Sequence, residues 1–218
     1  MNFGNMVGDS FAYAKDAIIG KWMRWLLLVI ATILLCLPLL GYSLKVLRGE
    51  NPAPEVTDWK TLFIDGIKYF IVAFIWAIPM LVIFVLTVSA GIVALINNPS
   101  SIAGAIGSML FGFIILAFIG ILTMIFSNIG IIRLARTGSI GEAFNFKEIT
   151  ATIVRIGWVP YIIALVVLVV AMIIIEIILS VIGMIPVLGL IIEIIFIAPL
   201  TIFEARYLSL VYDSAGTA

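Results

Sequence analysis

The sequence predicts an all-α integral membrane protein: a bundle of four to five transmembrane helices, with a proline-broken apolar element near the N-terminus and amphipathic interfacial helices. Hydrophobic residues make up 64% of the 218 residues and charged residues 11%, whereas soluble domains average about 45–50% and 25%. Several apolar runs reach the roughly 20 residues that a spanning helix needs. Most charged residues lie between these runs, so we expect one membrane domain over 1–218.

Composition also excludes several kinds of site. The twelve basic and twelve acidic residues balance, so net charge indicates no nucleic-acid partner. The sequence has no histidine, the commonest metal ligand, and its single cysteine, Cys36, cannot form an intramolecular disulfide. We therefore expect no metal and no cofactor.

The N-terminal third begins with an expected amphipathic helix over 9–20. Trp22 and Trp25 then mark the membrane interface, where aromatic residues are enriched. Residues 22–48 form an apolar element that Pro38 breaks, because proline removes a backbone hydrogen bond inside a helix. The element is therefore either a hairpin or a kinked span.

The longest polar passage runs from Gly41 to Lys68. Pro52 and Pro54 exclude a helix in its middle. An interfacial helix is expected over 57–68, capped by Thr57 or Asp58.

The remaining chain predicts four transmembrane helices over 69–96, 102–134, 157–182 and 187–212. Turns are expected at 97–101 and 183–186, where Asn, Gly, Pro and Ser cluster. Helical spacing of Phe146, Ile149, Ile153 and Ile156 predicts a second surface helix before the third of these spans.

Small residues at Gly104, Ser108 and Gly112 form a ridge that would let another helix pack closely. We expect a helix-packing role, with the neighbouring helix in this chain or in a second copy.

The two long connections resemble each other. Gly41–Gly49 and Gly130–Gly138 share a glycine frame, and Asp58-Trp59-Lys60 matches Asn145-Phe146-Lys147 at an offset of 87 residues. This pattern indicates either an internal repeat or convergence on a common interface sequence.

Orientation follows from the basic residues, which collect in short cytoplasmic loops. The two expected turns contain none, so we place both long connections in the cytoplasm and predict a multi-pass protein of the cytoplasmic membrane. Lys15, Lys21 and Arg24 fit this rule if 22–48 re-enters the membrane. Five full spans would instead put the N-terminus outside.

Two acidic residues lie well inside spans, Glu176 and Glu193. Ionisable groups at such depth are costly and often functional. Both lie about 8.5 residues from the centre of the expected turn, hence at a common depth of ~13 Å on neighbouring helices. They are candidates for ion or proton coupling, or a neutral carboxyl pair that only packs.

A second set of candidates gathers near the expected cytoplasmic surface and could contact lipid or a partner. The basic and aromatic members are Lys45, Arg48, Trp59, Lys60, Lys68, Arg133, Arg136, Phe146, Lys147 and Arg155. At headgroup level each basic residue would favour anionic lipid by about 1 kcal/mol. Plain anchoring would need the same residues.

The passage after Gly41-Tyr42 carries a recognisable block: Arg48-Gly49, Pro52-Ala53-Pro54-Glu55, Asp58-Trp59, Leu62-Phe63 and Asp65-Gly66. It resembles a family of small, largely archaeal polytopic membrane proteins, domain of unknown function 4013. The resemblance implies a membrane protein over the whole chain. It brings no activity, cofactor or catalytic residue.

The function expected is a non-enzymatic membrane module that binds a partner protein or lipid through its cytoplasmic face. No G-x-S-x-G, H-E-x-x-H or P-loop motif occurs. Expected partners are membrane lipids, with a membrane-protein partner or a homo-oligomer as further candidates. The alternative is a small proton- or cation-coupled transporter or channel that uses Glu176 and Glu193.

Overall fold

A computed structural model describes residues 1–97, 102–185 and 187–216. Its α-helices are α1 (Phe3–Ile18), α2 (Trp22–Ile33), α3 (Leu37–Leu47), α4 (Trp59–Asn97), α5 (Ile102–Thr137), α6 (Phe146–Ile156), α7 (Trp158–Gly183) and α8 (Leu188–Asp213), with a short 3₁₀ helix, Gly141–Phe144. Four of them, α4, α5, α7 and α8, are long and apolar enough to cross a membrane. The predicted all-α membrane fold is confirmed. The turn expected at 97–101 lies largely outside the described residues, as does Pro186 of the second turn.

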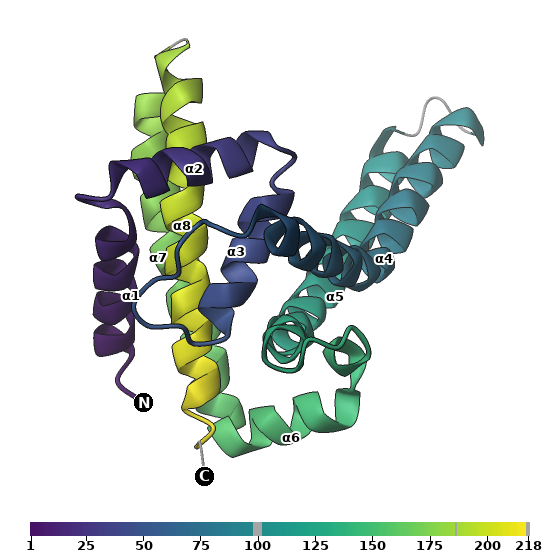
Figure 1. Ribbon diagram of the computed structural model, residues 1–218. Coiled ribbons are helices and arrows are strands. Elements are labelled where there is room, and N and C mark those ends of the chain that lie inside the picture. The colour runs from purple at the N-terminus through teal and green to yellow at the C-terminus, as the bar shows by residue number, and fades with distance from the viewer. Residues whose placement is uncertain (98–101, 186, 217–218) are drawn as a thin grey trace.

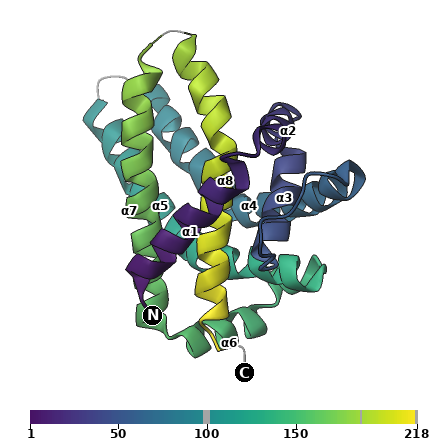
Figure 2. The ribbon, with the colours of Figure 1, turned by 60° about the vertical axis from the view of Figure 1, so that its left-hand side comes forward.

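The spanning helices form two hairpins that lean apart. In Figure 1 the α4–α5 pair diverges from the α7–α8 pair, and α6 lies across the base near the C-terminus. Figure 2 shows the same arrangement from the side, with α1 crossing the lower halves of α7 and α8. Side chains buried near the base include Tyr42, Ile132, Ile149 and Tyr207. The outer half of α4–α5 instead exposes apolar residues such as Phe111 and Ile114, as expected of a surface that faces lipid.

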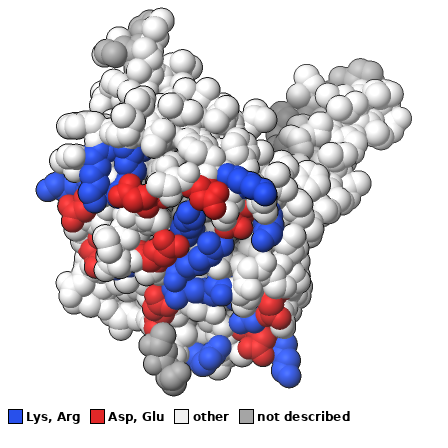
Figure 3. Space-filling view, in the orientation of Figure 1, with Lys and Arg blue, Asp and Glu red and all other residues white. Residues whose placement is uncertain are grey.

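Charged side chains gather at the base. Figure 3 shows Lys, Arg, Asp and Glu over the middle and lower part of this face, below the two hairpin arms. Arg136 of α5 bonds the carbonyl of Leu47, at the end of α3, and the carboxylate of Asp213, at the end of α8. The two long connections, 48–58 and 138–145, therefore lie at one end of the molecule with the C-terminal end of α8. We call this the charged end.

The N-terminal apolar element is broken between α2 and α3. Leu35 and Cys36 have φ of 58° and 60°, and Pro38 follows in the first turn of α3, where a proline needs no N–H partner. With 12 and 11 residues, each helix is shorter than about 20 Å and cannot cross a 30 Å hydrocarbon core. α2 lies crosswise to α8 (Figures 1 and 2), whereas α3 runs beside it. α2 therefore runs across α8 and not along it.

The start of the chain stays close to the first long connection. The Tyr13 hydroxyl donates to the carbonyl of Glu50 at 2.7 Å, and Arg24 forms an ion pair with Glu55. Burial raises the pKa of Tyr13 to about 12, so the phenol remains a donor at neutral pH. These contacts place Tyr13 and Arg24 beside the first long connection. Re-entry of 22–48 into the membrane stays a prediction.

Two expected boundaries differ from the structure. The surface helix expected over 57–68 and the span expected over 69–96 form one helix, α4, which runs without a break through Gly66, Lys68 and Tyr69. In the second connection Gly157, at φ 93°, does separate α6 from α7. The helix expected over 9–20 begins earlier, at Phe3, because the Asn2 side chain accepts from the N–H of Asn5.

Candidate functional site at the charged end

The family-like block forms a close junction between α3 and α4. Gly41 lies against the carbonyl oxygen of Leu62, and Gly66 lies against that of Leu37, so the two helix backbones touch. The Tyr42 hydroxyl donates to the carbonyl of Pro54 at 2.9 Å and holds the proline-containing loop over this junction. Absence of Cβ atoms at two glycines is what allows this approach.

Two arginines cross between the helix ends. The Nε–H of Arg48 donates to the carbonyl of Ala135 at 3.0 Å, and the Nε–H of Arg136 donates to that of Leu47 at 2.8 Å. Each guanidinium therefore binds a last-turn carbonyl of the other helix, where positive charge is favourable. Arg48 also bonds Asp65 at 2.6 Å, which ties α4 to the same cluster.

Arg136 connects α5 to two other helices. Besides Leu47, its guanidinium donates to the Ser209 hydroxyl at 2.9 Å and to the Asp213 carboxylate at 2.8 Å. It also lies 5.6 Å from the ring centroid of Tyr212. One side chain of α5 thus connects the ends of α3 and α8.

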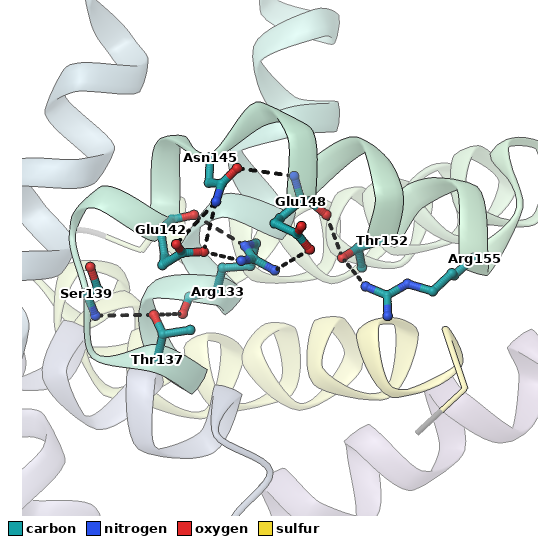
Figure 4. A network of polar contacts seen from close by, with 8 residues as sticks. All are labelled: Arg133, Thr137, Ser139, Glu142, Asn145, Glu148, Thr152 and Arg155. Carbon is teal, nitrogen blue, oxygen red and sulfur yellow. Dashed lines mark hydrogen bonds and ion pairs between the residues drawn. The ribbon is translucent and has the colours of Figure 1, made fainter. Parts of the chain in front are cut away.

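A third arginine organises the second connection. Figure 4 shows Arg133 paired with Glu142, with the carboxylate of Glu148 4.0 Å away. Asn145 donates to Glu142 and caps α6 by accepting from the N–H of Glu148 at 3.3 Å. Arg133 and Asn145 hold the pKa of the Glu142 carboxyl below its ordinary value of 4.5, so it is ionised at neutral pH. The 138–145 connection is therefore bound to α5.

The two connections share two local features. Gly49 and Gly138 follow α3 and α5 with φ of 85° and 72°. Asp58 accepts from the N–H of Thr61 at 3.2 Å, as Asn145 does at the start of α6. Glycine ends one helix and a short polar side chain caps the next in both, because these residues suit those positions.

The lipid or partner candidates divide into two groups. Arg48, Lys68, Arg133 and Arg136 each pair with a carboxylate of this chain. Within the described ranges, Lys45, Lys60, Lys147 and Arg155 form no ion pair. Arg155 donates to the Thr152 hydroxyl of its own helix. The first group is therefore largely occupied inside the protein, which the sequence could not show because its carboxylates lie up to 77 residues away.

The aromatic candidates also pack within the chain. The Phe146 ring lies 5.5 Å from that of Trp76 and 6.0 Å from that of Phe126, although Phe146 remains 55% exposed. Trp59 is half-buried against the core. Both begin a helix at the charged end.

The structure separates the two glutamates that the sequence placed at a common depth. Glu176 lines a groove of ≈ 620 Å³ between α5, α7 and α8, together with Glu204 and Asn128. Glu193 instead lies beside Gly183, near the tip of the α7–α8 hairpin. A Cβ atom added to Gly183 would be 3.0 Å from Oε1 of Glu193. The carboxylate that shares the groove with Glu176 is therefore Glu204. Glu204 was not among the candidates that the sequence indicated, although its place within an apolar run of α8 was a usable signal.

The small-residue ridge lies partly in the α4–α5 contact. Gly112 lies against the Thr87 side chain of α4, and Ala105 is buried. Gly104 is exposed, and the Ser108 hydroxyl donates to the carbonyl of Ala105 in its own helix. The contact thus follows Ala105 and Gly112, within the chain, and leaves Gly104 outside it.

Apolar spanning helices joined by charged connections at one end define a multi-pass membrane protein. Residues 25–184 match the family described as "Protein of unknown function (DUF4013)", and the chain belongs to that family. The match contains the α3–α4 junction and Glu176 and ends before Glu193 and Glu204. No curated protein and no solved structure matches the chain.

Proposed function

We propose that this protein is a non-enzymatic module of the cytoplasmic membrane whose charged end binds anionic lipid headgroups. One observation carries the proposal: two of the acidic residues, Glu176 and Glu193, lie within α7 and α8 away from the charged end. Because basic and acidic residues balance over the whole chain, the charged end keeps a net positive charge. The negative surface of the cytoplasmic leaflet attracts such a surface.

The basic residues without ion pairs supply the contact. Lys60 lies in the first turn of α4 and Lys147 in that of α6, and both are exposed. α6 lies across the base (Figure 1), with Ile149 and Ile153 buried and Arg155 exposed. This arrangement suits a helix that rests on a membrane surface with its cationic side chains among the headgroups.

We expect Lys60→Gln/Lys147→Gln to lower the selectivity of the protein for anionic lipid by up to about five-fold per lysine, because each basic residue near the surface contributes ~1 kcal/mol. Spin-labelled phosphatidylglycerol and phosphatidylcholine in proteoliposomes would measure it, as the fraction of each lipid that the protein immobilises. Lys60→Arg/Lys147→Arg is the matched control and should keep the selectivity. Unchanged selectivity in the glutamine variant would contradict the proposal. Loss of a co-purifying protein without a change in lipid selectivity would favour a protein partner instead.

A second candidate function is supported by the groove, which brings Glu176, Glu204 and Asn128 together between spanning helices. Carboxylates in such a position suit proton or cation transfer. We would expect reconstituted protein to show proton or cation flux and Glu176→Gln to reduce it at least ten-fold. Glu193→Gln, outside the groove, is the matched control. Absence of flux in wild-type proteoliposomes would remove this candidate.

A further inference from the structure

An apolar pocket of ≈ 600 Å³ lies on the other side of the α7–α8 hairpin, under α1 and the start of α2. Its volume is within the range of about 300–1,000 Å³ of small-molecule sites. Its walls include Phe11, Ile18, Trp22, Phe196, Leu200 and Phe203. These side chains are aromatic or aliphatic, as a site for a hydrocarbon chain requires.

Trp25 bonds a backbone carbonyl that a proline in α8 leaves free. Pro199 lies inside α8 and has no N–H, so the carbonyl of Ile195, one turn earlier, loses its partner within the helix. The indole N–H of Trp25 donates to this carbonyl at 3.2 Å, and the Trp25 ring stacks on Trp22 at 5.6 Å. The two tryptophans of α2 are therefore attached to α8.

The charge on the walls of the pocket is positive. Lys15 is the charged residue on its walls and forms no ion pair within the described ranges. The α1 carboxylates, Asp9 and Asp16, line a separate hollow on the other face of this helix, where Asp9 pairs with Arg206. An apolar pocket beside the ammonium group of Lys15 matches a molecule with a hydrocarbon chain and an anionic head.

We propose that this pocket holds an acyl chain of one anionic phospholipid, whose phosphate binds Lys15. Lysine can reach along its aliphatic stem towards the headgroup region while the stem stays on apolar surface. The site is separate from Lys60 and Lys147 and goes beyond the headgroup binding proposed for the charged end. Either proposal can therefore fail while the other stands.

The test is retention of phosphatidylglycerol or phosphatidylcholine by detergent-purified protein, counted by native mass spectrometry. Wild type should retain one phosphatidylglycerol in preference to phosphatidylcholine. Lys15→Gln should lower that retention about five-fold, the contribution of one basic residue, and Lys15→Arg should keep it. Leu200→Trp, which fills the pocket, should also lower it, whereas Lys60→Gln/Lys147→Gln should leave it unchanged.

Tryptophan fluorescence tests whether the acyl chain of the lipid lies in this pocket. Phosphatidylglycerol with brominated acyl chains should quench wild-type fluorescence more than it quenches Trp22→Phe, because Trp22 lies on the pocket wall. Equal retention of the two lipids by wild type, or unchanged retention in Lys15→Gln, would overturn the proposal. Loss in Lys60→Gln/Lys147→Gln equal to that in Lys15→Gln would also overturn it, since the lipid would then bind at the charged end.

Discussion

Replacement of Gly66 by valine is expected to prevent folding. A Cβ atom at this position would overlap the backbone carbonyl of Leu37, and a Cβ at Gly41 would overlap that of Leu62. A flexible side chain could move aside, but these obstacles are backbone atoms of the neighbouring helix. We therefore expect a loss of about 3 kcal/mol or more, at or above the upper end for overpacking. Thermal melting in detergent and recovery of a monodisperse peak in size-exclusion chromatography would measure it.

Gly107 offers a matched control, since it lies within a spanning helix and a Cβ there would meet nothing within 4 Å. Gly107→Val should melt close to wild type, and Gly41→Val should behave like Gly66→Val. Melting of Gly66→Val within a few degrees of wild type would show that α3 and α4 do not touch through their backbones. The family block would then need another explanation.

Replacement of Arg136 by alanine should cause the second-largest loss. Its guanidinium donates to Leu47, Ser209 and Asp213. Hydrogen bonds that involve a charged group contribute about 1.5–3 kcal/mol each, so a loss of at least ~3 kcal/mol is expected even with partial solvent access. Arg136→Lys should not restore stability, because an ammonium group lacks the planar fork that reaches the three partners at once.

The matched control is Arg155→Ala, which removes an arginine whose described hydrogen bond is to Thr152 in its own helix. It should melt near wild type. Cysteine cross-linking between the ends of α3 and α8 in Arg136→Ala would show whether these ends separate. Stability equal to that of Arg155→Ala would mean that the crossed arginines do not hold the charged end together.

The features predictable from the sequence are those that depend on neighbours along the chain. Hydropathy and length located the four spanning helices, because a bilayer requires long apolar runs. A cap at Asp58 could also be expected, because a short polar side chain there accepts from a free N–H at the start of a helix. Even the break near Pro38 was visible, although the turn itself falls at Leu35 and Cys36. Continuity of α4 was missed, since the amphipathic pattern of 57–68 does not show whether a helix ends there.

The candidate sites depend on contacts between residues far apart in the chain and were therefore harder to predict from the sequence. Nothing near Arg136 in the chain indicates Asp213 as its partner. Only the positions of the carboxylates in the folded protein show which basic residues form ion pairs and which do not. For Glu176, equal spacing from a turn gives equal depth but not the rotation of each helix about its axis. That rotation puts Glu204 in the groove and Glu193 beside Gly183.

By itself, the sequence determined that this is a multi-pass helical membrane protein whose two long charged connections lie on the same side, because burial of apolar runs in lipid depends on composition and period alone. Tertiary structure decided which charged groups are neutralised by the protein and which stay available to a ligand. The physical reason is that ion pairs and pockets form between side chains brought within a few ångströms by packing, and packing between helices is not encoded in any one stretch of the chain.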